Sequence, residues 1–108
     1  MSVPEAQPDV RLTAWVHGQV QGVGFRWWTR CRALELGLTG YAANHLDGRV
    51  EVVAHGPRAA AAALLELLRG GESWPARPGR VDNVVVDWSA PLEGAGEEFV
   101  GFVERGPR

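Results

Sequence analysis

The segment Gly18–Gly24 constrains this chain more than any other. It places three glycines within seven residues, between a stretch with strand-like alternation and a stretch with helix-like spacing. Glycine adopts positive φ without strain, so such a segment lets successive backbone N–H groups turn toward one point. A helix start adds unpaired N–H groups and partial positive charge. The segment therefore predicts an anion-binding loop, although a tight turn without a ligand explains the glycines alone equally well.

Apolar spacing and turn residues divide most of the chain into short strands and helices. Residues 10–17 alternate as a half-buried strand does, and Asp47-Gly48 is typical of a hairpin turn. The predicted strands are Val10–His17, Thr39–His45, Arg49–His55 and Val81–Trp88, with a short extra strand over Phe99–Val103; the predicted helices are Phe25–Leu36 and Pro57–Arg69. This order predicts an α+β, ferredoxin-like βαββαβ sandwich: an antiparallel sheet with two helices on one face.

The first predicted helix has two possible buried faces. One stripe consists of Phe25, Trp28, Ala33 and Leu36, and the other consists of Trp27, Cys31 and Leu34. Gly37 suits the position just past the end of this helix, and Pro57 suits the first position of the second helix. The pattern does not decide between the two stripes.

Length and charge limit the classes of protein that this chain can belong to. With 108 residues it can build one core, so we expect one domain over residues 10–103, a mobile N-terminal tail over residues 1–9 and a C-terminal tail over residues 104–108. The net charge of −2 attracts neither nucleic acid nor an acidic membrane surface. A single cysteine and the absence of a signal-peptide pattern favour a cytoplasmic protein, which we expect to be a monomer.

The predicted topology brings two polar residues toward the glycine-rich segment. A right-handed crossover places the ends of the first and second strands at the same edge of the sheet, with the third strand between them. The loop Gly18–Arg26 and Asn44 should then lie on the order of 10 Å apart, which leaves room for one phosphate and one water. Arg26 can bind two phosphate oxygens through its planar guanidinium.

Two well-known phosphate loops do not fit this segment. A dinucleotide-binding fingerprint needs a third glycine where the chain has Trp27, and the Gly-Lys-Ser/Thr sequence of a Walker loop occurs nowhere in the chain. The loop therefore has to belong to another class of phosphate site.

Two longer motifs resemble the signatures of the acylphosphatase family. Residues 16–26 read VHGQVQGVGFR and resemble the first signature throughout; Gly40-Tyr41-Ala42-Ala43-Asn44, followed by Gly48, Val50 and Gly56, resembles the second with every spacing kept. The likeness covers residues 10 to 103, and its details are similar to actinobacterial members.

The resemblance implies a function and a set of site residues. The family hydrolyses small acyl phosphates, without a metal or a cofactor. The resemblance implies that Arg26 and the amides of the loop bind the phosphoryl group, and that Asn44 orients the attacking water. The loop residues are Gly18, Gln19, Val20, Gln21, Gly22, Val23, Gly24 and Phe25.

The chemistry of the substrate agrees with this set of groups. An acyl phosphate releases a carboxylate whose conjugate acid has a pKa of about 4, so no general acid is needed. Phosphoryl transfer then requires mainly positioning and charge neutralisation, which one arginine, several amides and one asparagine supply. The substrate phosphate itself is one hypothesis for the proton acceptor.

Two positions depart from the family pattern. Many members have a hydroxyl residue after the asparagine, where this chain has His45. The hydrogen bond from that hydroxyl to the asparagine therefore does not carry over to Asn44. The residues Arg105–Arg108 extend past the predicted last strand, so the contacts of the chain end cannot be carried over from the family.

Other functions are weaker interpretations of the same residues. His17, His45 and His55 lack the carboxylate or cysteine companions of a metal site, and Cys31 reads as a buried small hydrophobe rather than a nucleophile. RNA-recognition modules share the order of elements, but the strand Arg49–His55 lacks their stacking aromatics. A non-catalytic acyl-phosphate sensor stays open and differs from an enzyme by the absence of turnover.

Overall fold

The computed structural model describes residues 9–91 and 101–106 of the chain. The elements in these ranges are β1 (Asp9–Gln19), α1 (Phe25–Glu35), β2 (Thr39–Asn44), β3 (Val50–Pro57), α2 (Arg58–Leu68), β4 (Arg80–Ser89) and β5 (Phe102–Arg105). The order β-α-β-β-α-β with an added strand confirms the predicted fold. Neither helix in this part of the chain is long and apolar enough to span a lipid bilayer.

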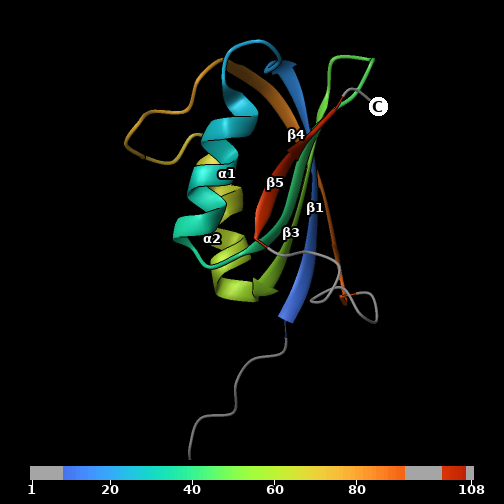
Figure 1. The fold of residues 1–108 in the computed structure, drawn as a ribbon, viewed down its shortest axis with the longest axis vertical. Coiled ribbons are helices and arrows are strands. Elements are labelled where there is room, and N and C mark those ends of the chain that lie inside the picture. The colour runs from blue at the N-terminus through green and yellow to red at the C-terminus, as the bar shows by residue number, and fades with distance from the viewer. Residues whose placement is uncertain (1–8, 92–100, 107–108) are drawn as a thin grey trace, which may run out of the picture.

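The sheet has the strand order β4-β1-β3-β2-β5, so β3 lies between β1 and β2 as predicted. The β1–β4, β1–β3 and β2–β3 pairs are antiparallel, whereas β2 and β5 are parallel. The four strands of the βαββαβ unit are antiparallel as predicted, and the added strand β5, for which no direction was predicted, makes the sheet mixed. Both helices cover one face of the sheet, and the β1–α1 loop and the β2–β3 turn lie at the same end (Figure 1).

The core lies between this face and the helices. Leu12, Ala14 and Val16 of β1 are fully buried there, which confirms the predicted alternation. In α1 the buried side is the stripe of Phe25 and Trp28, while Trp27 is 51% exposed. Thr29 and Arg32 are also buried on this side, and no apolar periodicity would have placed them there.

The predicted element bounds are wrong at several ends. β1 runs two residues past His17, because Gly18 and Gln19 continue the pairing with β4 after a register shift. Pro57 ends β3 and precedes α2, since its ψ of 141° is extended. β5 reaches Arg105 rather than ending at Val103. The predicted tail residues 1–8 and 107–108, and residues 99 and 100 of the predicted extra strand, lie outside the described ranges.

Gly18 is required where β1 meets β4, and its replacement is our first prediction. Its φ is +142°, and a Cβ at this position would lie 2.1 Å from the carbonyl oxygen of Arg80. We expect Gly18→Ala to lower the free energy of unfolding by roughly 2–4 kcal/mol, because the strands must separate and the backbone is strained. Gly22→Ala is the matched control. The φ of Gly22 is +75° and no atom of the described residues lies within 4 Å of the added Cβ, so a loss of about 1–2 kcal/mol is expected. Urea denaturation measures both, and equal losses would contradict the close-contact argument.

Candidate active site

The loop between β1 and α1 is anchored at its ends and open at its tip. Val20 and Phe25 are each 1% exposed and belong to the core, so only their backbone groups can face a ligand. Between them, Gly22 and Gly24 have φ of +75° and +85°, and no atom of the described residues lies within 4 Å of a Cβ added at either position. The left-handed glycines thus produce a tight loop, and no described residue covers it on the side where these Cβ atoms would lie.

Most backbone N–H groups of this loop have no hydrogen-bond acceptor among the described residues. Within the described part of the chain, the N–H groups of residues 21–26 have no hydrogen-bond acceptor, and the first loop-to-helix bond runs from Trp28 N–H to the carbonyl of Gly24 at 3.0 Å. The first turn of any helix leaves N–H groups unpaired, but here the series begins before the helix. Such a run of unpaired amides is suited to several oxygens of one anion.

Arg26 lies in the first turn of α1 and is half-buried. Its Nη1 donates a hydrogen bond to the carbonyl oxygen of Arg105 in β5 at 2.8 Å. One turn further along α1, Nε of Arg30 donates to the carbonyl of Phe102 at 3.0 Å. The two arginines therefore hold β5 beside α1, and the other donors of the Arg26 guanidinium have no acceptor among the described residues.

Asn44 is the last residue of β2, where it pairs with Val50 of β3. Its Oδ1 is buried and has no hydrogen-bond partner among the residues that the structure describes. A Cβ on Gly106 would lie 2.9 Å from the Cβ of Asn44, so the two residues are in contact. Because Arg26 binds Arg105 and Asn44 contacts Gly106, both predicted site residues border the same two-residue segment.

His45 has a partner other than Asn44. Its Nε2 lies 3.0 Å from Oε1 of Glu51, and its ring packs edge-on against Trp15 with centroids 4.7 Å apart. Oε2 of the same carboxylate accepts a hydrogen bond from the hydroxyl of Tyr41 at 3.2 Å. The residue that departs from the family pattern is thus held on the sheet face opposite the helices, and it supplies no side-chain hydrogen bond to Asn44.

The turn after His45 is closed by a charged pair. The backbone N–H of Arg49 donates to Oδ1 of Asp47 at 3.1 Å, and its Nε donates to Oδ2 at 2.7 Å. The pKa of Asp47 lies below its ordinary value, chiefly because of the backbone hydrogen bond from Arg49 and then because of its side chain. The carboxylate is therefore ionised at neutral pH and accepts both hydrogen bonds from Arg49.

The structure also describes the histidines and the cysteine that were considered for other functions. In residues 9–91 and 101–106 no group of three or more His, Cys, Asp and Glu side chains lies close enough to hold a metal ion. His45 contacts Glu51, whereas His55 is buried with 5% exposure. Cys31 is free and half-buried, so it is less buried than the predicted small hydrophobe.

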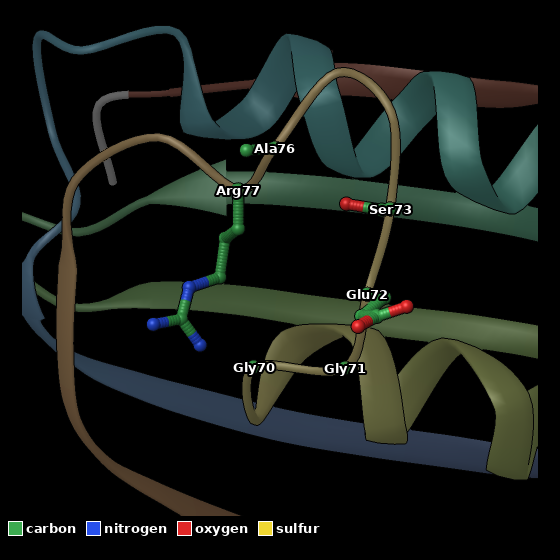
Figure 2. A pocket seen from close by; sticks show the side chains of 6 residues that line it. All are labelled: Gly70, Gly71, Glu72, Ser73, Ala76 and Arg77. Atoms are coloured by element: carbon green, nitrogen blue, oxygen red, sulfur yellow. The ribbon is translucent and has the colours of Figure 1, made fainter.

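One cavity lies away from these residues. It has a volume of about 460 Å³ and lies between the end of α2 and the loop before β4, lined by Gly70, Gly71, Glu72, Ser73, Ala76 and Arg77 (Figure 2). Nη1 of Arg77 is already bound to the carbonyl of Leu68 at 2.6 Å, so this arginine closes the end of α2. The cavity contains neither Arg26 nor Asn44, and the candidate site is the open loop instead.

Three contacts at this site could not be predicted from the sequence. The carbonyl of Arg105 fixes Arg26, Gly106 packs on Asn44, and the side chain of Gln21 binds carbonyls of the β2–β3 turn. Every residue has a carbonyl, so the sequence contains no signal that singles out these acceptors.

Comparisons with known proteins agree over nearly the whole chain. Residues 12–102 match a family model described as Acylphosphatase. A Mycobacterium avium protein described as an acylphosphatase is 77% identical over 99 residues, which cover 92% of this chain and 98% of that relative. A Mycobacterium tuberculosis protein with the same description is 69% identical over 98 residues, which cover 91% and 97% of the two chains.

Solved structures give the same result at lower identity. The crystal structure of an acylphosphatase from Bacillus subtilis is 33% identical, with a TM-score of 0.74 over 88% of this chain and 97% of that chain. The structure of an acylphosphatase from Coxiella burnetii is also 33% identical, with a TM-score of 0.74 over 91% and 94%.

Proposed function

Because the chain belongs to the acylphosphatase family and has acylphosphatase activity, we propose that Arg26 and the loop amides bind the phosphoryl group while Asn44 orients the attacking water. The substrates are small acyl phosphates, and the reaction converts an acyl phosphate and water into a carboxylate and phosphate. The predicted loop amides are those of residues 18–25, and among them the N–H groups of residues 21–25 have no acceptor in the described part of the chain.

The main support for this proposal is the grouping of the loop N–H groups with Arg26 and Asn44. Three features lie at one end of the sheet. One is the guanidinium of Arg26. The other two have no partner among the described residues: the N–H groups of residues 21–26 and the buried Oδ1 of Asn44. The segment Arg105–Gly106 contacts both side chains. Donors for phosphate oxygens and an acceptor for water thus meet in one region, which is what in-line hydrolysis requires.

Each group has a distinct task in the proposed reaction. The Arg26 guanidinium and the amides donate to the phosphate oxygens, and each charge-assisted bond is worth roughly 1.5–3 kcal/mol. Oδ1 of Asn44 accepts a hydrogen bond from the water, so that a lone pair of the water oxygen faces phosphorus. An amide cannot take up the proton, and the substrate phosphate accepts it instead.

The bonds formed and broken explain why few groups are needed. The water oxygen forms a bond to phosphorus, and the bond between phosphorus and the acyl oxygen breaks. The electron pair leaves with the carboxylate, whose conjugate acid has a pKa of about 4, so no acid has to protonate it. Since the amides are held by the fold, they need little reorganisation as charge develops.

The test is steady-state hydrolysis of benzoyl phosphate with and without EDTA. We expect equal rates in both, with benzoate and phosphate released together. Phenyl phosphate is the matched substrate: its leaving group has a pKa of about 10, and without a general acid we expect its hydrolysis to be at least roughly 10²-fold slower. Loss of activity in EDTA, or phosphate binding without benzoate release, would contradict the proposal.

We further propose that the chain works as a monomer in the cytoplasm. The single cysteine is free and half-buried, which suits a reducing compartment. Light scattering tests the first part, because a monomer has a mass of 11.7 kDa.

A further inference from the structure

The side chain of Gln21 connects the phosphate loop to the β2–β3 turn. Its Nε2 lies 2.7 Å from the carbonyl oxygen of His45 and 3.0 Å from that of Arg49. We propose that Gln21 is a positioning residue that fixes Asn44 relative to the loop amides. This inference rests on the proposed function, in which the loop holds the phosphoryl group and Asn44 holds the water.

The two acceptors belong to the residues that close the β2–β3 turn. The backbone N–H of His45 donates to the carbonyl of Arg49 at 2.9 Å, and the N–H of Gly48 donates to the carbonyl of His45 at 3.1 Å. His45 follows Asn44 directly, and Arg49 precedes the residue that pairs with Asn44. Holding these two carbonyls therefore holds the strand ends from which Asn44 projects.

The chemistry of this contact requires an amide. Both neighbours are carbonyl oxygens, which only accept hydrogen bonds, so the –NH₂ end of Gln21 must face them. Its two hydrogens supply one donor to each carbonyl. A glutamate of the same length would present a carboxylate oxygen to two other oxygens, and only its protonated form could donate.

The loop has no other described polar contact to the turn. Its ends are fixed by the buried side chains of Val20 and Phe25, whereas residues 21–24 are exposed and include two left-handed glycines. In the described residues, the hydrogen bonds between the loop and the turn are the two made by Gln21. Without them, no hydrogen bond among the described residues fixes the distance between the tip of the loop and the turn that follows Asn44.

Loss of the Gln21 side chain is expected to slow the chemical step without weakening phosphate binding. Phosphate affinity depends on the loop amides and Arg26, which remain when the Gln21 side chain is removed. Alignment of water with phosphorus depends on the distance between the loop and Asn44, and a displacement of about 1 Å can cost 10²-fold in rate. A merely structural role in shaping the loop would weaken phosphate binding as well.

Gln21→Ala tests this separation with benzoyl phosphate. We expect kcat to fall roughly tenfold, while competitive inhibition by inorganic phosphate changes less than about twofold, because its donors are retained. Unchanged kcat, or an equal loss of phosphate affinity, would overturn the proposal.

Gln21→Glu adds a signature in the pH profile. Its kcat relative to the unmodified protein should rise as the pH falls toward and below about 4.3, where the new carboxyl gains a proton. Gln19→Glu is the matched control, since Gln19 is exposed in the same segment and its side chain has no hydrogen bond to another described residue. The control measures the effect of the added charge alone. The same rise in both variants would overturn the proposal.

A measurement without turnover separates this inference from the proposed function. In NMR spectra of the unmodified protein, the side-chain amide protons of Gln21 should show cross-relaxation to protons of residues 45–49, and those of Gln19 should not. If benzoyl phosphate is not hydrolysed but these signals are present, the proposed function fails and the contact stands. If hydrolysis occurs and the signals are absent, the positioning role of Gln21 is wrong.

Discussion

Replacing Arg26 with alanine is expected to lower kcat/KM for benzoyl phosphate by roughly 10²–10³-fold, comparable to the removal of one oxyanion donor. The guanidinium is the one cation placed at the start of α1 with donors that no described residue accepts. Its removal leaves the phosphoryl group to the amides alone. Inhibition by inorganic phosphate should weaken in the same variant, and steady-state kinetics with and without phosphate measure both effects.

Two further variants identify the cause of this loss. Arg26→Lys should recover little activity, because an ammonium cannot bind two phosphate oxygens with the geometry of a guanidinium. Arg30→Ala removes the equivalent hydrogen bond from α1 to β5, at the carbonyl of Phe102, one helical turn further from the loop. We expect its activity to stay within about threefold of the unmodified protein. If Arg30→Ala loses as much as Arg26→Ala, docking of β5 rather than phosphate binding explains the effect.

The fold could be predicted from the sequence because its signals are local. Alternation in residues 10–17, the Asp47-Gly48 turn and the alanine- and leucine-rich stretch before Arg69 each follow from neighbouring residues. The ends of elements depend on distant partners instead. β1 extends through Gly18 because β4 pairs with it there and the carbonyl of Arg80 lies close to it. The residues next to Gly18 in the sequence do not indicate this distant partner.

The candidate site divides in the same way. Arg26, Asn44 and the glycines could be chosen from motif spacing, because side-chain type and order determine which groups can reach one edge of the sheet. The hydrogen-bond partners of the site's side chains could not be predicted, because the acceptors are backbone carbonyls. Arg26 donates to the carbonyl of Arg105, and Gln21 donates to that of His45. The sequence shows that His45 replaces a hydroxyl residue of the family pattern. Its pairing with Glu51 could not be predicted, because it depends on the register of β2 against β3.

Asn44→Ala is expected to lower kcat by roughly 10²-fold, with a much smaller change in KM. The reason is that an amide oxygen accepts a hydrogen bond from water but not from an ionised phosphate oxygen, and Oδ1 of Asn44 has no other partner among the described residues. Loss of an interaction that acts mainly in the transition state lowers kcat, whereas loss of substrate binding raises KM. Benzoyl phosphate kinetics at saturating and limiting concentrations separate the two.

Asn44→Asp is the sharper form of this experiment, because aspartate has the same shape and keeps an oxygen that can accept a hydrogen bond from water. Its negative charge would lie near the phosphoryl group, so inhibition by inorganic phosphate should weaken in Asn44→Asp but not in Asn44→Ala. That contrast would place the side chain beside the phosphate while assigning its catalytic role to water. A rise in KM without a fall in kcat for Asn44→Ala would instead make Asn44 a substrate-binding residue, and the attacking water would then have to be oriented by another group.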